Sequence, residues 1–154
     1  MDWAQIAQVI VAVLSIVPPS VELYKTIHDR LSRASSRNIQ QALTRPEPDT
    51  AAGRNQLTQL LIQTAQNDPE FADTLSSLFN DTQNVLMDCL LNQFTSRDLR
   101  EVYARLGIGF DDLVAGTLAG KADKANALIE HLKMGGRIPE LIAAMWKVRP
   151  SLHC

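Results

Sequence analysis

Cysteine and aromatic residues are scarce in this sequence. Only Cys89 and Cys154 are present among 154 residues, and phenylalanine, tryptophan and tyrosine together make up 5% of the chain. The two cysteines form no CxxC pair and offer no disulfide framework, so a reducing cytoplasm is the expected compartment. Cys89 shares an apolar helical face with Leu86 and Leu90, and we expect it in the core rather than as a nucleophile.

An excess of positive charge is also missing. The chain has 15 basic and 17 acidic residues, which gives a formal net charge of -2. A nucleic-acid-binding protein usually carries a basic face or stripe, and neither half of this chain is a charged tail. We therefore expect no nucleic-acid partner.

The residue patterns of catalytic and cofactor sites are missing as well. His28, His131 and His153 are scattered, with no HExxH motif and no cysteine at metal-ligand spacing. No group of glycines is followed by the lysine and serine or threonine of a phosphate-binding loop. We expect no catalytic residue, no cofactor and no metal, and the chain is interpreted as a non-enzymatic protein.

Strand patterns are absent, because no run of the sequence alternates apolar and polar residues. Apolar residues instead recur every three or four positions, which is the spacing of one helix face. The sequence predicts an all-α fold. We expect an N-terminal helical hairpin or bundle in residues 1–81 and a compact bundle of about five to six short helices in residues 82–154.

No charged residue occurs from Trp3 to Val21, and this stretch predicts an apolar helix over residues 3–17. A second helix from Ser20 to about Ser32 would form a hairpin with it, bent at Pro18–Pro19. The apolar part is short for a hydrocarbon layer of roughly 30 Å and also suits a buried helix, so both interpretations stay open. The candidates for membrane or oligomer contacts are Trp3, Ile6, Ile10, Val13, Leu14 and Val17.

Further helices are expected after a loop near residues 45–53, where proline, acidic and small residues interrupt the helical pattern. These helices are predicted near residues 54–66 and 69–80. Between them, Asp68 is placed to cap the second helix, with Pro69 at its first position.

The signals for helix ends are clearest in the C-terminal half. Thr95, with Asp98 three residues later, predicts a capped helix that ends at Gly107. The neighbouring helices are expected to be short and joined by tight turns. Their expected boundaries are a start at Phe110 for a helix reaching Leu118, an end at Gly135–Gly136, a start at Pro139 and a stop at Arg149–Pro150.

The run from Leu86 to Leu152 resembles the bacterial effector-associated domains. The motifs that carry the resemblance are Phe94 before a Ser-Arg-Asp-Leu helix start, Leu106–Gly107, and a Gly-Arg-Ile-Pro-Glu-Leu run at 136–141 followed by Arg149–Pro150. The run departs from many relatives at Pro139, where they have glutamate. The resemblance implies a death-like helical adaptor of bacterial immunity and antiphage defence, which ties an effector chain to a sensor or protease chain through contacts between like modules.

Residues Gln41 to Phe79 are in turn similar to a recurrent region of small bacterial effector proteins. The similarity consists of a helix, an Asp-Pro-Glu turn at 68–70 and another helix, after an apolar N-terminal segment. It implies that the N-terminal segment is the effector and acts on a membrane. A cytoplasmic chain recruited to the inner membrane is expected on this basis.

Charged residues of both signs in the C-terminal half are the candidates for partner contacts, because complementary charges favour orientation and specificity. The expected partners are a chain with a matching domain and further copies of this chain. The leading hypothesis joins this adaptor to an N-terminal region that oligomerises or perturbs a membrane; the alternative is a soluble helical scaffold without membrane activity. The interaction candidates are Arg97, Arg100, Asp111, Asp112, Lys121, Lys124, Arg137 and Glu140.

Overall fold

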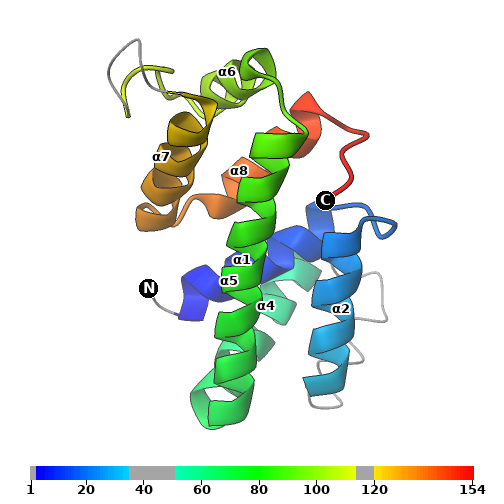
Figure 1. Cartoon of the computed structure of the whole chain (residues 1–154). Coiled ribbons are helices and arrows are strands. Elements are labelled where there is room, and N and C mark those ends of the chain that lie inside the picture. The colour runs from blue at the N-terminus through cyan, green and yellow to red at the C-terminus, as the bar shows by residue number, and fades with distance from the viewer. Residues whose placement is uncertain (1–2, 35–50, 114–119) are drawn as a thin grey trace. The chain divides into compact units, whose positions relative to one another are not determined.

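The structure is a computed structural model that describes residues 3–34, 51–113 and 120–154 (Figure 1). The described residues contain seven α-helices and no strand, which confirms the all-α prediction. They form two compact units, which we call the N-terminal unit (Met1–Thr82) and the C-terminal unit (Gln83–Cys154).

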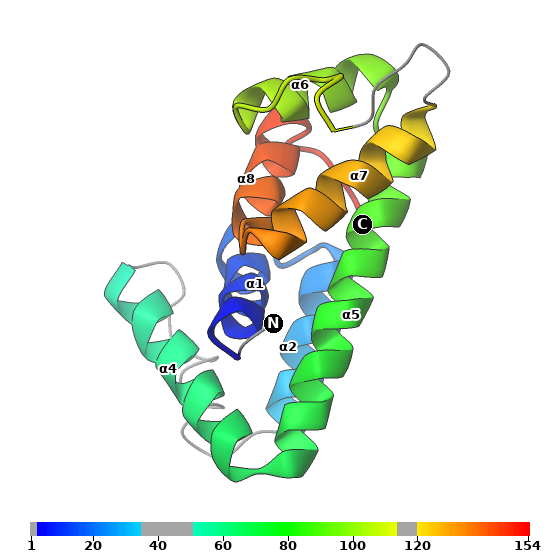
Figure 2. The same cartoon turned by 90° about the vertical axis from the view of Figure 1, so that its left-hand side faces the viewer.

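The N-terminal unit is built around α1 (Trp3–Ile16), which packs against both α2 (Glu22–Ala34) and α4 (Ala51–Asn67), as Figure 2 shows. The chain turns at the predicted prolines, where the amide of Val21 donates to the carbonyl of Pro18 at 3.0 Å. Of the loop expected near 45–53, residues 45–50 lie outside the described part of the chain. Residues 51–53 already belong to α4.

Apolar spacing explains which faces of these helices are buried. In α4, Leu57, Leu61 and Ala65 recur at every fourth position and form one buried stripe. The helix α1 differs, because residues 6–14 are buried on nearly all sides and only Gln8 among them is exposed. A helix without charge that is apolar all round needs neighbours on several faces, and α2 and α4 provide two of them.

The helix predicted near 69–80 does not end there. It continues as α5 (Pro69–Asn92), and no separate helix begins near Thr82. The predicted start is confirmed, because Asp68 Oδ1 accepts from the amides of Glu70 at 3.0 Å and Phe71 at 3.4 Å. The residues at the expected break are polar, but none is proline or glycine. Thr82 is instead buried and its hydroxyl donates to the carbonyl of Leu78 at 2.7 Å, which keeps it inside the helix.

Among its described residues, the C-terminal unit contains the end of α5 and three shorter helices, α6 (Ser96–Arg105), α7 (Lys121–Met134) and α8 (Ile138–Val148). Figures 1 and 2 show α6 lying across the ends of α7 and α8. The helix expected to begin at Phe110 is not formed in the described residues, because 110–113 are turns. Its remainder, 114–119, lies outside the described part of the chain.

The predicted ends of α6, α7 and α8 are confirmed. Thr95 and Asp98 form a reciprocal capping box at 3.1 Å in both directions. Gly107 and Gly136 have positive φ angles of 72° and 67°, the left-handed conformation that lets the chain leave a helix without a Cβ clash. These local devices fix where α6 and α7 stop and therefore where the loops between the helices begin.

The last residues, 149–154, form what we call the C-terminal strap. Arg149 Nη1 donates to the carbonyl of Gln93 at 2.8 Å and pairs with Asp98 at 3.2 Å. The Gln93 side chain binds the backbone N–H and carbonyl of His153, and Leu152 is buried. The strap is thereby held against the start of α6.

The expectation that the two cysteines offer no disulfide is wrong. Cys89 and Cys154 are joined, with their Cα atoms 5.9 Å apart across a sequence separation of 65 residues. The reason is tertiary, because the strap returns the end of the chain to α5. Cys89 is 2% exposed, so its predicted place in the core is confirmed.

Candidate protein-interaction site

The six N-terminal residues predicted to make membrane or oligomer contacts lie inside the structure rather than on its surface. Trp3 is half-buried, and the other five are at most 7% exposed. None of the helices in the described residues has the length and apolar character that crossing a bilayer requires. Membrane contact through these side chains would therefore require them to leave their present neighbours. The five buried candidates are Ile6, Ile10, Val13, Leu14 and Val17.

Lys124 and Asp111, both predicted as partner contacts, bind each other inside the C-terminal unit. Lys124 is 3% exposed, and its ammonium donates to Asp111 Oδ1 at 2.8 Å and to the carbonyl of Phe110 at 2.7 Å. The Lys124 hydrogen bond is the main cause that lowers the pKa of Asp111. Lys124 therefore holds the turn that carries Asp111 and cannot itself meet a partner, because burial removes it from the surface.

An aromatic cluster completes this anchor. The rings of Tyr103 and Phe110 meet edge to face with centroids 5.1 Å apart. The guanidinium of Arg100, another predicted contact, lies 4.6 Å from the Phe110 centroid, in cation–π geometry. The Tyr103 hydroxyl donates to the carbonyl of Lys124 at 2.6 Å, and burial raises the pKa of Tyr103 to about 12. The cluster links α6, α7 and the turn between them.

Three further candidates are divided between structural and exposed positions. The Lys121 ammonium donates to the carbonyl of Leu91 at 2.6 Å and so ties the start of α7 to the end of α5. Asp112 Oδ2 accepts from the amide of Gly109 at 3.1 Å and closes the turn, while the residue stays exposed. Arg97 is exposed in the first turn of α6.

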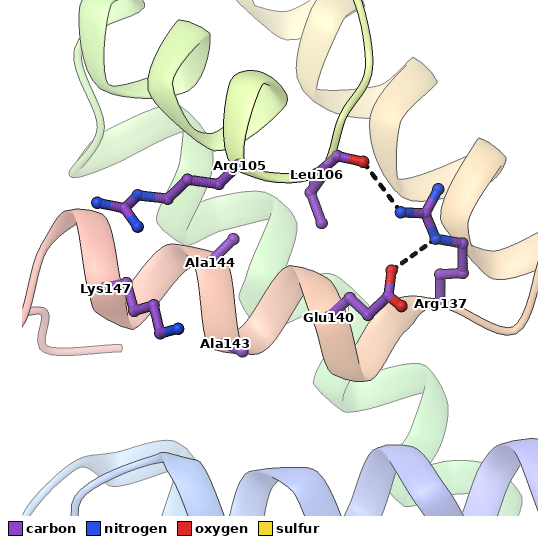
Figure 3. Close-up of a pocket in the computed structure, with 7 residues that line it drawn as sticks. All are labelled: Arg105, Leu106, Arg137, Glu140, Ala143, Ala144 and Lys147. Carbon is purple, nitrogen blue, oxygen red and sulfur yellow. Dashed lines mark hydrogen bonds and ion pairs between the residues drawn. The ribbon is translucent and has the colours of Figure 1, made fainter.

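The last two candidates, Arg137 and Glu140, are brought together at one end of a surface groove. Arg137 Nε pairs with Glu140 Oε2 at 2.6 Å, and its Nη2 donates to the carbonyl of Leu106 at 3.0 Å. The second bond satisfies a carbonyl at the end of α6 that the helix itself leaves open. Figure 3 shows both bonds.

The groove lies between the end of α6 and α8 and has a volume of about 580 Å³. We call it the α6–α8 groove. Ala143 and Ala144 of α8 contribute small side chains to its lining. In Figure 3, Arg105 and Lys147 lie toward the end of the lining that is away from Arg137. The lining residues are Arg105, Leu106, Arg137, Glu140, Ala143, Ala144 and Lys147.

Sequence reasoning missed Arg105 and Lys147, because they are separated by 42 positions and only the packing of α6 against α8 brings them together. One local signal was present. Glu140, Ala143, Ala144 and Lys147 recur at the three- and four-residue spacing of a helix face.

The charged lining of the groove has the chemistry of an anion site. Arg105 and Lys147 present cationic N–H donors, and such donors form their strongest hydrogen bonds with carboxylate oxygens. The ion pair between Arg137 and Glu140 leaves the net positive charge of the lining at the Arg105 and Lys147 end. Recognition of an acidic protein surface is thus the chemistry that this site supports.

Comparisons with known proteins bear on the same unit. No curated protein and no solved structure matches the chain at a significant level. A family model does match, over residues 86–150. That span begins in α5 and ends at Pro150, within the C-terminal unit. The matching model is that of effector-associated domain 7, so the C-terminal half of the chain is an effector-associated domain, which implies an adaptor of a bacterial conflict system.

Proposed function

We propose that the chain is a non-catalytic adaptor whose C-terminal unit binds a partner chain carrying a matching effector-associated domain. The observation that carries this proposal is the family match over residues 86–150. The geometry of the unit supports it. Lys121 and Lys124 join segments of the unit through hydrogen bonds, while the α6–α8 groove has Arg105 and Lys147 exposed in its lining.

The proposal is tested with purified full-length protein against other effector-associated-domain chains from the same bacterium, each titrated singly by calorimetry. At least one such chain is expected to bind, and a chain stripped of its effector-associated domain is expected not to. Binding that is unaffected by removal of the partner's domain would contradict the proposal, as would the failure of every such chain to bind.

For the N-terminal unit, the leading hypothesis remains an oligomerising or membrane-perturbing effector, supported by the uncharged sequence from Trp3 to Val21. A specific observation favours the alternative, a helical scaffold without membrane activity. The apolar residues of α1 are buried among its neighbours in the chain, so membrane activity would need this helix to be released. Release would expose its apolar surface to water, at a cost of roughly 25 cal/mol per Å².

Leakage of dye from anionic phospholipid vesicles separates these two functions. An effector is expected to cause leakage once the partner chain has been added, because partner binding is the step that could release α1. A scaffold is expected to leave the vesicles intact with and without the partner. The partner alone serves as the control, and leakage by the partner alone would remove the evidence for an effector.

A further inference from the structure

We propose that the bond between Cys89 and Cys154 is a reversible redox latch for the C-terminal strap. Oxidation fastens residues 150–154 against the end of α5, and reduction frees them and uncovers the apolar site that Leu152 fills. This inference goes beyond the adaptor function, because it concerns how the surface of the C-terminal unit changes and not which chain the unit binds. A disulfide in a reducing cytoplasm, the compartment expected from the sequence, is usually transient and redox-sensing rather than structural.

The two cysteines lie in different parts of the C-terminal unit. Cys89 is in α5, inside the span of residues 86–150 that the family model matches, and it is 2% exposed. Cys154 is half-buried and lies beyond that span, on a strap that is not helical. The helices of the unit are therefore complete without the end of the strap, so this end can detach while the unit stays folded.

Apart from the disulfide, few contacts hold the end of the strap. Within the described residues, the hydrogen bonds that join residues 150–154 to another part of the unit are those between the Gln93 side chain and the backbone of His153, and they are exposed. Exposed hydrogen bonds contribute little, because water replaces them on release. Arg149 is bound separately and fixes only the start of the strap. The burial of Leu152, which is 2% exposed, is the main remaining attachment.

A low-molecular-weight thiol is the reductant, and it acts by thiol–disulfide exchange. Cys154 is the more accessible of the two residues, so the incoming thiolate attacks its sulfur. The S–S bond breaks, and its electron pair stays on the Cys89 sulfur, which takes up a proton. A second small thiolate then attacks the small molecule's sulfur in the mixed disulfide and releases the Cys154 thiolate, which is also protonated. Two small thiols become one small disulfide, and the protein gains two electrons and two protons.

The docked strap also allows the bond to form again. It holds the Cα atoms of Cys89 and Cys154 5.9 Å apart, a separation that a disulfide spans without movement of the backbone. Exchange with the small-molecule disulfide then runs in reverse and closes the latch. Docking of the strap and formation of the bond therefore stabilise each other. A change that weakens docking must make the bond easier to reduce by the same factor.

The test equilibrates the full-length chain in buffers with different ratios of reduced to oxidised glutathione, and free thiols are counted by alkylation and mass spectrometry. The wild-type chain is expected to pass from the disulfide to the dithiol form as the share of reduced glutathione rises. Amide exchange, followed by NMR across the same transition, should show that Leu152 and His153 lose protection. The amide of Asp98, in the capping box of α6, should keep its protection.

Three variants relate the bond to docking of the strap. Leu152→Ala removes the apolar attachment, so it should favour the dithiol form by at least about tenfold at a given glutathione ratio. Met134→Ala is the matched control, because Met134 belongs to the same unit but is 84% exposed, and it should titrate like the wild-type chain. Cys154→Ser cannot close the latch, so its strap amides should exchange rapidly at every glutathione ratio.

A bond that does not form in oxidised glutathione, or that persists in a large excess of reduced glutathione, would overturn the inference, because the latch would have only one state. Equal protection of the Leu152 and His153 amides in both forms would also overturn it, and so would a folded Leu152→Ala chain that titrates like the wild type. These results are distinct from failure of the adaptor function. A chain that binds a matching domain but has no redox transition would contradict only the latch.

Discussion

The N-terminal and C-terminal units use their polar residues in different ways. In the described part of the N-terminal unit, Arg30 pairs with Asp81 at 2.5 Å and donates to the hydroxyl of Ser77 at 3.1 Å, both near the surface. In the C-terminal unit, Lys124, Lys121 and Arg137 each donate to a backbone carbonyl of another segment. Among the described residues, the first unit buries an uncharged helix between its neighbours, and the second has fixed polar links between its short helices.

This difference follows from helix length. The helices α4 and α5 are 17 and 24 residues long and bury long apolar faces, while α6 and α8 have 10 and 11 residues. Short helices are marginal by themselves and leave many unsatisfied groups at their ends. The C-terminal unit satisfies several of these groups with side chains, and the same side chains fix the positions of its turns and helix ends.

The largest expected effect is on the free energy of unfolding, and it tests whether the two units unfold independently. Phe94 is 1% exposed, and Phe94→Ala should destabilise the C-terminal unit by about 3–5 kcal/mol through loss of burial and creation of a cavity. Hydrogen exchange measured by mass spectrometry should show lost protection in α6, α7 and α8 with little change in α1 and α4. Leu61→Ala is the matched variant in the N-terminal unit. Equal loss of protection in both units would show that the two units do not unfold independently.

The disulfide gives the next largest effect and is confined to the C-terminal unit. Cross-linking residues 65 positions apart removes loop entropy from the unfolded chain, so Cys154→Ser should lower the free energy of unfolding by about 3–4 kcal/mol. Thermal unfolding with and without a reducing agent checks this. Reduction should shift the melting temperature of the wild-type chain and leave that of the variant unchanged. A wild-type chain insensitive to reduction would show that the strap is held without the bond.

The capping box should give a smaller, pH-dependent effect. The backbone N–H of Thr95 is the main cause that lowers the pKa of Asp98 below its ordinary value of 3.8. A carboxyl whose pKa is lowered by folding stabilises the protein above the unfolded pKa, and this contribution disappears as pH falls through the folded value. Asp98→Asn should therefore cost about 1 kcal/mol at neutral pH and progressively less in acid. Denaturant melts from pH 7 to about pH 2 measure it, and a constant difference would contradict the assignment.

The smallest effect is expected in the N-terminal unit. The side chains of Arg30 and Asp81 are 36% and 51% exposed, and exposed ion pairs contribute about 0–1 kcal/mol. Asp81→Asn should change the free energy of unfolding by less than about 0.5 kcal/mol at physiological salt. Urea denaturation is the measurement. A loss above about 1 kcal/mol would show that this unit also depends on a fixed polar link, and the contrast between the units would weaken.

Several features could be predicted because their signals are local. Thr95 with Asp98, Asp68 before Pro69, and Gly107 each act within a few residues, and all three have the predicted roles. The continuity of α5 was missed because the local signals near Thr82 do not favour a helix. Its polar residues near Thr82 are weak helix formers, and only the buried environment of that side chain shows that the helix continues.

The candidate site was predicted less completely than the helix ends, because it depends on contacts between separate segments. Charge and surface position in a helix were enough to nominate Arg137 and Glu140, and they do line the groove. The same criteria nominated Lys124, which is buried, because a sequence does not reveal that Asp111 and the Phe110 carbonyl surround its ammonium. Arg105 was passed over, because its importance depends on a helix that begins more than thirty residues later.

The sequence by itself determined the all-α class, the principal caps and stops of the C-terminal helices, and the effector-associated domain over residues 86–150. Only the tertiary structure decided that Cys154 reaches Cys89, that Lys124 is internal, and that Arg105 and Lys147 line one groove. The reason is physical. Caps and helix faces arise from interactions over a few residues, whereas pairs and grooves depend on how separate helices pack in space.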